Sequence, residues 1–255
     1  MKTIEFIGPS GIGKSTFLSS YEKYLAEKNS PVAISQYQAS ELIRKKYVKY
    51  PLYHKLRRML KGKGQLDYIK KKSQLFEENS KELEPIVDLF ILCIQRSGLK
   101  TWKKIWLSEY YFDKILYQIA KIHDAAVHDC VILEEGIIQN GFFANVELEL
   151  VKNANLSRLK LMPKGVVIFT LDEEEYKNRI NKRFKKRGRN DLNAVTKRMS
   201  PEEVEAHVRM TKEVTETHKI IVSALQLPYL IIDAHATRHN FEKLDNFINK
   251  LSSQV

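Results

Sequence analysis

The sequence predicts an α/β fold in which a five-stranded parallel sheet lies between two layers of helices. Two observations support this prediction. Five short apolar runs are spaced along the chain, and long helical stretches separate them, as in sheets whose strands are joined by helical crossovers. The chain has 255 residues, of which 43% are hydrophobic, and it contains no low-complexity tract. This is enough for one α/β domain with insertions, so we expect residues 1–255 to form a single domain.

The expected strands are short and apolar, which is typical of strands buried on both faces of a parallel sheet. They are Thr3–Ile7, Val32–Ser35, Cys130–Leu133, Val166–Leu171 and Tyr229–Ile232. Residues 36–129, between the second and third strands, are mostly helical and too long for a simple crossover. We expect this helical insertion to form the side of the molecule that binds an acceptor.

Several helices have marked starts. Asp172 precedes three glutamates, which supplies an N-cap and acids for a first turn, and Ser200 precedes Pro201 in the same way. Pro85 is expected to open a helix through Ile94 that Gly98 ends. The remaining expected helices are 16–26 and 102–128.

The first strand leads directly into a complete phosphate-binding motif, G-x-x-x-x-G-K-[ST]. It comprises Gly8, Pro9, Ser10, Gly11, Ile12, Gly13, Lys14 and Ser15, and Thr16 follows it into the helix. Its glycines allow backbone N–H groups to turn inward around phosphates, the lysine reaches the β- and γ-phosphates, and the Ser15 hydroxyl ligates Mg²⁺. The N-terminus of the following helix favours the same anion. The motif therefore predicts binding of ATP and Mg²⁺.

The net charge of +12 is concentrated in two blocks. Residues 44–72 contain twelve Lys and Arg and one acid, a composition that suits nucleic acid, an anionic surface or a solvated helical face. Residues 177–189 contain eight Lys and Arg and no acid. Within the second block Arg179, Arg183 and Arg187 share one helical face, and Arg189 follows. Such a face can close over a transferring phosphoryl group, so we expect residues 172–199 to form a lid.

Other features narrow the class of protein. The chain has no N-K-x-D motif of GTPases and no L-S-G-G-Q signature of transporter ATPases. No apolar run is long enough to span a membrane, and no signal peptide is recognisable, so we expect a cytoplasmic protein. Cys93 and Cys130 lie in apolar runs without metal-type spacing and are expected to be reduced core residues.

Five features in order resemble the thymidylate kinase and deoxynucleoside kinase branch of the P-loop kinases. They are the loop GPSGIGKST, the helix LFILCIQRSG with Arg96, the strand end VILEEG, the segment LMP leading into VVIFTLD, and the arginine-rich segment ending in Arg187-Gly188-Arg189. The resemblance implies a P-loop NTPase fold with sheet order 2-3-1-4-5 and its site at the carboxyl ends of the strands.

The resemblance also implies roles for individual residues. Glu134 would position Mg²⁺ through water or act as the base, and Arg183, Arg187 and Arg189 would neutralise the transferring group. Arg96 would contact an anionic part of the acceptor. The expected activity is ATP- and Mg²⁺-dependent transfer of a phosphoryl group to a nucleoside, a nucleotide or another small molecule with a hydroxyl group.

The sequence departs from this branch at the acceptor side. Glu135 stands where these kinases have arginine, and a second carboxylate there would repel an acceptor phosphate. The second strand ends in Ser35-Gln36, without the carboxylate that deoxynucleoside kinases use as a base, and the insertion is longer and more basic. Two alternatives stay open: a polynucleotide or RNA kinase that grips its substrate through the basic insertion, and a regulatory ATPase without an acceptor. The sequence also leaves open whether the chain forms a homodimer.

Overall fold

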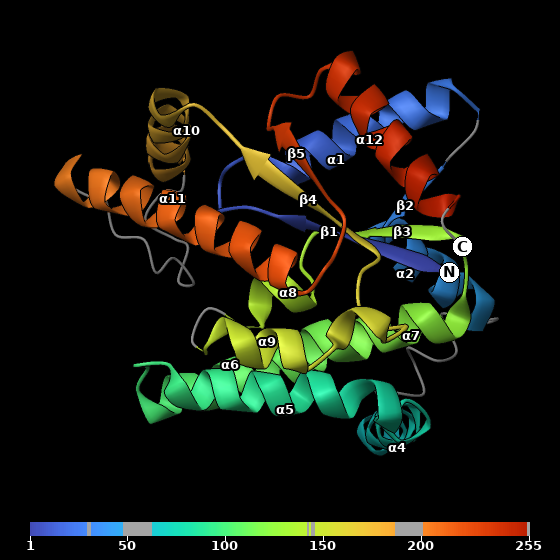
Figure 1. Cartoon of the computed structure of the whole chain (residues 1–255). Coiled ribbons are helices and arrows are strands. Elements are labelled where there is room, and N and C mark those ends of the chain that lie inside the picture. The colour runs from blue at the N-terminus through green and yellow to red at the C-terminus, as the bar shows by residue number, and fades with distance from the viewer. Residues whose placement is uncertain (30–31, 48–62, 142, 144–145, 187–200, 254–255) are drawn as a thin grey trace.

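A five-stranded parallel sheet forms the centre of the computed structural model, which describes residues 1–29, 32–47, 63–141, 143, 146–186 and 201–253 (Figure 1). The strands are β1 (Lys2–Ile7), β2 (Ile34–Ser35), β3 (Cys130–Leu133), β4 (Gly165–Thr170) and β5 (Tyr229–Asp233). Their order is β2-β3-β1-β4-β5, and every neighbouring pair is parallel. The predicted α/β class, strand number, direction and order are confirmed.

The two faces of the sheet bury different side chains. In β1, Ile4 and Phe6 belong to one core cluster, whereas Ile7 belongs to the other. Successive side chains of a strand point to opposite faces, so Thr3 and Glu5 share the face of Ile7. Both polar residues are fully buried. Cys93 and Cys130 are also buried and unpaired, as predicted.

Three helices have their described core residues only on the face of Ile4 and Phe6. They are α1 (Lys14–Glu27), α10 (Glu173–Lys186) and α12 (Arg238–Ser252). Aromatic rings join this layer to the sheet, because the Phe17 ring on α1 lies 5.1 Å from that of Phe169 and 5.2 Å from that of Phe241. This packing fixes the helix that follows the glycine-rich loop.

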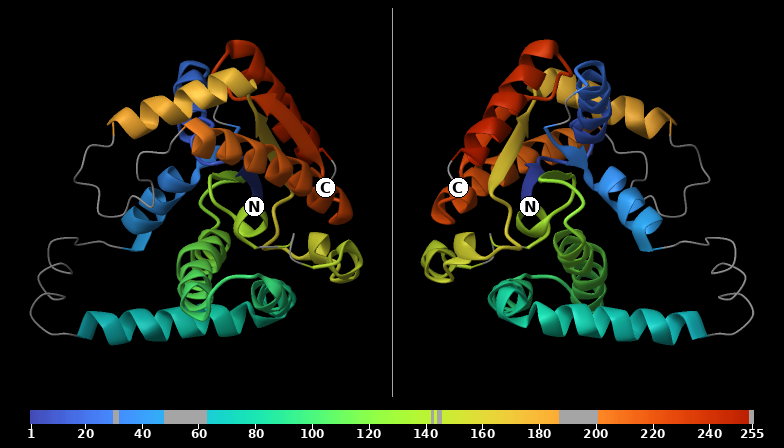
Figure 2. Two further views of the ribbon diagram at one scale, coloured as in Figure 1. Left: turned by 90° about the vertical axis from the view of Figure 1, so that its left-hand side faces the viewer. Right: turned by 90° about the vertical axis from the view of Figure 1, so that its right-hand side faces the viewer.

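The insertion side carries most of the remaining helices. They are α2 (Gln36–Tyr47), α4 (Lys63–Glu78), α5 (Ser80–Arg96), α6 (Thr101–Tyr110), the π-helical turn η1 (Tyr111–Leu116), α7 (Tyr117–Ala125), α8 (Ile137–Asn140), α9 (Leu148–Asn153) and the 3₁₀ turn η3 (Leu156–Arg158), joined by α11 (Pro201–Ala224), which spans both core clusters. Figures 1 and 2 show α7 between the sheet and the outer pair α4 and α5.

Two predicted helices differ from those observed. The helix expected to open at Pro85 begins at Ser80, because Leu83 already packs into the core and Pro85 is accommodated inside the helix. The single helix expected over 102–128 is divided into α6, η1 and α7. No residue of α6 is buried, whereas Tyr111, Ile115 and Leu116 of η1 are. A π turn inserts one residue per turn and so rotates the buried face between the two helices.

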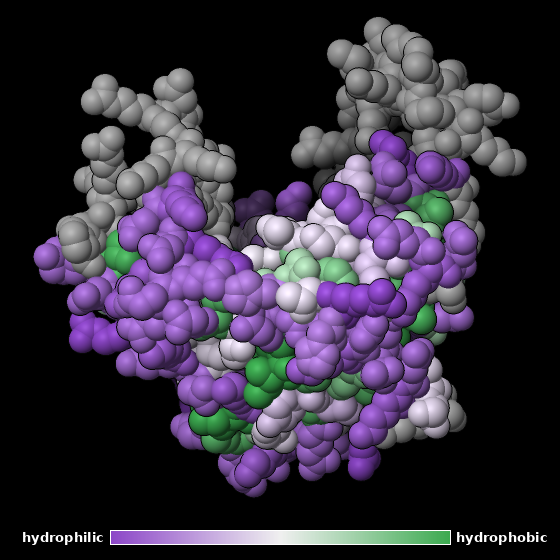
Figure 3. Space-filling view, turned by 90° about the horizontal axis from the view of Figure 1, so that it is seen from above, coloured by the Kyte–Doolittle hydropathy of each residue, from purple (hydrophilic) through white to green (hydrophobic). Residues whose placement is uncertain are grey.

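The face shown in Figure 3 is largely polar: hydrophilic side chains cover most of it, with apolar ones in smaller areas among them. None of the helices in the described ranges combines the length and the apolarity that crossing a membrane requires. Trp102 and Trp106 of α6, the two tryptophans of the chain, are 66% and 56% exposed.

Candidate functional site

The loop between β1 and α1, residues 8–13, has a backbone conformation that requires glycine. Gly11 has φ +90° and Gly13 has φ +118°, values that other residues rarely adopt. At Gly13 an added Cβ would also lie 2.5 Å from Nη1 of Arg179, so a side chain there would displace the guanidinium. We call this segment the glycine loop.

The glycine loop presents the start of α1 to solvent. Gly13 is the N-cap of α1 and has no side chain, and the first turn contains no acidic residue. The partial positive charge of the helix N-terminus is therefore not neutralised by a carboxylate of its own first turn. Lys14, the first residue of α1, donates a hydrogen bond to the carbonyl of Gly8 at 2.5 Å, which folds its side chain back over the loop.

A cavity of about 590 Å³ lies against the glycine loop at the carboxyl ends of the strands. The loop and the start of α1 form one wall, and side chains that follow β2 and β3 form another, with residues of α6, η1 and α8 completing it. The lining residues are Pro9, Ser10, Gly11, Gly13, Lys14, Ser15, Thr16, Gln36, Tyr110, Lys114, Ile115, Glu134, Glu135 and Gln139. The position agrees with the rule that parallel α/β sheets bind ligands beyond the carboxyl ends of their strands.

Two adjacent carboxylates after β3 occupy different environments. Glu134 is half-buried, and its Oε1 is buried without a hydrogen-bond partner among the described residues. Glu135 is exposed and accepts a hydrogen bond from the hydroxyl of Tyr110. Burial, together with this bond to Glu135, raises the pKa of Tyr110 to about 12. Tyr110 is therefore a donor at neutral pH and holds Glu135 at the cavity.

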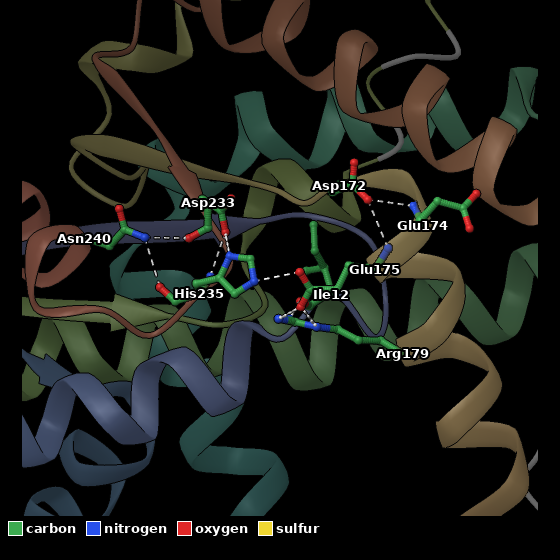
Figure 4. A network of polar contacts seen from close by, with 8 residues as sticks. All are labelled: Ile12, Asp172, Glu174, Glu175, Arg179, Asp233, His235 and Asn240. Carbon is green, nitrogen blue, oxygen red and sulfur yellow. Dashed lines mark hydrogen bonds and ion pairs between the residues drawn. The ribbon is translucent and has the colours of Figure 1, made fainter.

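A polar network lies behind the glycine loop (Figure 4). Arg179 of α10 donates from Nη1 to the carbonyl of Ile12 at 2.5 Å, and its Nε and Nη2 donate to Glu175 at 3.0 and 2.6 Å. The other oxygen of Glu175 lies 2.7 Å from Nε2 of His235, whose Nδ1 bonds Asp233 at the end of β5. The network thus connects the loop to α10 and to the turn between β5 and α12.

The interactions within this network favour the charged forms of His235 and Glu175. Partial desolvation lowers the pKa of His235, but its hydrogen bonds to Asp233 and Glu175 outweigh this effect and raise it above the ordinary value. The guanidinium of Arg179 lowers the pKa of Glu175.

Asp172 caps α10 by accepting a hydrogen bond from the N–H of Glu174 at 2.9 Å, so the N-cap predicted from the sequence is present.

The predicted site residues are only partly brought together. Lys14, Ser15, Glu134 and Glu135 line one cavity. Arg96 is outside this set: it lies at the end of α5 and pairs with Glu147, and its role toward an acceptor stays a prediction. The side chain of Arg183, and Arg187 and Arg189 altogether, lie outside the described residues.

Sequence reasoning missed several cavity residues. The sequence marks Gln36 only as a residue that stands where a carboxylate is expected, and no motif marks Tyr110, Lys114 or Gln139. The spacing of Tyr110 and Lys114 places them on one helical face, and this spacing is the signal in the sequence that could have identified them.

Within the basic block of residues 44–72, the described cations include Lys72, which pairs with Asp113, and Arg44, which pairs with Glu41.

The described residues contain no group of three or more His, Cys, Asp or Glu side chains arranged to hold a metal ion. Mg²⁺ at a nucleotide site is bound differently, through one or two protein oxygens, phosphates and water. Ser15 and Glu134 supply such oxygens at the cavity. No family model matches the chain, and no curated protein matches it either.

Proposed function

We propose that the chain is a P-loop kinase that transfers the γ-phosphoryl group of ATP, with Mg²⁺, to a hydroxyl group of a small molecule. One observation carries the proposal: the cavity places the glycine loop and Lys14 opposite two strand-end carboxylates. Phosphoryl transfer depends on positioning and on neutralising charge, and these are the groups that it needs. The resemblance to thymidylate and deoxynucleoside kinases supports the same class of reaction.

The glycine loop would hold the triphosphate. Its positive-φ glycines and the uncompensated N-terminus of α1 suit an anion, and Lys14 would contact the β- and γ-phosphates. Ser15 and Glu134 would hold Mg²⁺, directly or through water, and Oε1 of Glu134, which has no hydrogen-bond partner among the described residues, fits this role. Bound Mg²⁺ supplies positive charge beside the phosphates.

In the transfer step, the acceptor oxygen bonds to the γ-phosphorus while the bond from that phosphorus to the bridging oxygen of ADP breaks. The hydroxyl proton passes to Glu134 or to solvent. Arg183, Arg187 and Arg189, carried by α10 and the segment after it, would neutralise the moving group when the lid closes.

The acceptor end of the cavity offers mainly neutral or negative groups. Gln36, Gln139 and the Tyr110–Glu135 pair can hydrogen-bond hydroxyl or amino groups, and Lys114 is the one cation among its described lining residues outside the start of α1. An uncharged or amine-bearing acceptor suits this composition better than a phosphate.

A screen for ADP release tests the proposal. The purified protein is incubated with Mg²⁺-ATP and with nucleosides, nucleotides, sugars or aminoglycosides. We expect turnover that depends on one class of acceptor. Turnover without any acceptor would instead favour a regulatory ATPase.

Two lysines of the same cavity provide a matched pair of variants. Lys14→Ala should lower kcat by about 10²–10³-fold or more, because it removes a contact to the moving group. Lys114→Ala should raise the KM of the acceptor and leave ATP binding unchanged. Equal activity of Lys14→Ala and the wild-type protein would refute the catalytic role of the glycine loop.

A further inference from the structure

A carboxylic acid is buried in the middle of the central strand. Glu5 of β1 is fully buried, although glutamate is almost never fully buried without a partner. It lies in the strand that leads into the glycine loop, and in the sheet it is paired with Leu133, the last residue of β3. Its side chain therefore lies at the point where both elements lead into the cavity.

Glu5 uses both carboxylate oxygens to bind the chain that follows β3. Oε2 accepts a hydrogen bond from the N–H of Ile138 at 3.1 Å, and Oε1 accepts one from the N–H of Gln139 at 2.7 Å. These N–H groups belong to the short helix that begins directly after Glu134, Glu135 and Gly136. Buried backbone donors of a helix start need such acceptors, since water does not reach them.

Gly136 completes the arrangement. A Cβ built at this position would lie 2.3 Å from the carboxyl carbon and from Oε2 of Glu5, a distance that no real side chain tolerates. The carboxylate of Glu5 therefore occupies the place of a side chain at residue 136. The turn that carries Glu134 and Glu135 is held against β1 by this contact.

We propose that Glu5 is a positioning residue that fixes segment 134–139 relative to the glycine loop. It does not touch the cavity, but Glu134, Glu135 and Gln139 do, and all three are attached to the segment that it binds. The proposal that this positioning serves phosphoryl transfer rests on the function proposed above.

The surroundings of Glu5 make the contact sensitive to protonation. Besides the N–H groups of residues 137–139, Lys14 and the buried hydroxyl of Tyr111 interact with it electrostatically. Burial raises the pKa of Glu5 to about 7, against the pull of the three N–H groups and Lys14. A protonated carboxyl keeps one good acceptor oxygen, so the second hydrogen bond weakens as the pH falls below this value.

The test compares Glu5→Gln with Thr3→Val. Glutamine has the shape of glutamate, but it places an NH₂ group against one of the two N–H donors. Thr3 lies on the same strand and the same face, is equally buried, and its hydroxyl has no hydrogen-bond partner among the described residues. The control therefore changes a buried polar side chain without removing a bond to segment 134–139.

Three measurements separate positioning from general damage. For Glu5→Gln we expect kcat to fall roughly ten- to a hundredfold, as misplacement of catalytic groups can cost, while the Kd of ATP stays the same or becomes lower. The pH profile of kcat should lose the ionisation near 7 that Glu5 contributes. Thr3→Val should match the wild-type protein in all three measurements. Wild-type kcat and pH profile in Glu5→Gln, or a loss of ATP binding equal to the loss of kcat, would overturn the proposal.

Amide hydrogen exchange tests the positioning itself and does not depend on the protein being a kinase. The N–H groups of Ile138 and Gln139 should exchange faster in Glu5→Gln than in the wild-type protein and unchanged in Thr3→Val. Equal exchange would refute the positioning role even if the wild-type protein is an active kinase. Faster exchange in a protein that never transfers phosphate would refute only the proposed function.

A second variant covers the case in which Glu5→Gln does not fold. Gly136→Ala keeps Glu5 and pushes the turn away from its carboxylate. It should also accelerate exchange at residues 138 and 139, and unchanged exchange there would overturn the proposal.

Discussion

Glu135 is the residue at which the chain departs most clearly from the kinases that it resembles. Its carboxylate is exposed at the cavity and is held by the hydroxyl of Tyr110. A hydrogen bond to a charged acceptor is stronger than one between neutral groups, so it restricts the orientation of the carboxylate. The position is therefore a built part of the cavity wall, not a loose surface glutamate.

The first prediction concerns the charge at this position. Glu135→Arg should raise kcat/KM for thymidylate and lower it for the best acceptor of the screen, because the change replaces repulsion of a phosphate by attraction. A double-reciprocal comparison of both acceptors in the wild-type protein and the variant provides the measurement. Tyr110→Phe serves as the control, since it frees Glu135 without changing the charge at this position.

One result would contradict the prediction that thymidylate is a poor acceptor of the wild-type protein. If the wild-type protein already phosphorylates thymidylate efficiently, Glu135 does not set acceptor charge, and the simple assignment to the thymidylate kinase branch becomes the better one.

At the scale of elements, α10 packs Tyr176 and Ile180 into the core, and a few polar side chains link it to the glycine loop and to the turn after β5. Glu175 links Arg179, which contacts the glycine loop, to His235 in the turn after β5 (Figure 4). Asn240 of α12 holds that turn by donating to the carbonyls of Asp233 and His235. The orientation of α10 and the shape of the loop are thus coupled.

The second prediction follows from this coupling. His235→Ala removes the side chain that bonds Glu175, so Arg179 loses its fixed orientation at the loop. We expect the KM of ATP to rise several-fold, with a smaller change in kcat. Steady-state kinetics at saturating acceptor measures the effect. Arg238→Ala is the control: it breaks the exposed pair of Arg238 with Glu242 on α12, close in sequence to His235, and should change neither constant. The same KM of ATP in His235→Ala and the wild-type protein would show that the network does not hold Arg179.

The third prediction uses the exposed face of α6. Trp106 stacks on Tyr110 with ring centroids 6.1 Å apart, and Tyr110 lines the cavity, whereas Trp102 lies one turn earlier. Binding of an acceptor at Glu135 should therefore change the fluorescence of Trp106. The change should persist in Trp102→Phe and disappear in Trp106→Phe. If an acceptor is turned over but changes the fluorescence of neither the wild-type protein nor Trp102→Phe, its binding site lies away from Tyr110.

The sequence predicted the elements better than it predicted the acceptor site. The strands are predominantly apolar runs and the glycine loop is a local motif, so both can be predicted from neighbouring residues. Gln36, Tyr110 and Gln139 come from three separate elements, and only tertiary packing brings them to one cavity. Glu5 was missed because it stands in an apolar run and because its partners follow more than a hundred residues later. The π turn at 111–116 left no pattern that a helical periodicity would reveal.

At the scale of the whole molecule, buried ionisable groups give the stability two opposite dependences on pH. Burial raises the pKa of Glu5 from 4.5 to about 7, so the folded state binds more protons there, and stability is lost as the pH rises through this range. Burial lowers the pKa of His123 and of His218 from 6.5 to about 4, so stability is lost as the pH falls through that range. Each shift corresponds to roughly 3 kcal/mol, and two histidines outweigh one glutamate.

The fourth prediction isolates the contribution of Glu5. The free energy of unfolding of the wild-type protein should rise with pH between about 4.5 and 6.5, and that of Glu5→Gln should rise more steeply. The difference, wild type minus variant, should fall by on the order of 3 kcal/mol from pH 4.5 to 7 and stay level outside this range. Urea denaturation at a series of pH values gives the measurement. The free energy of unfolding of Thr3→Val should change with pH in the same way as that of the wild-type protein. A difference that does not change with pH would mean that Glu5 has an ordinary pKa.

The central position of β1 also determines when the glycine loop can form during folding. Lys2 pairs with Cys130 and Ile4 with Gly165, so both neighbours of β1 are far along the chain. On a ribosome, β1 would leave the exit tunnel long before either partner strand has been synthesised. Pairings between such distant segments form slowly, because the intervening chain must first be closed into a loop. We therefore expect nucleotide binding to be acquired late in refolding, after the helices of the insertion have formed.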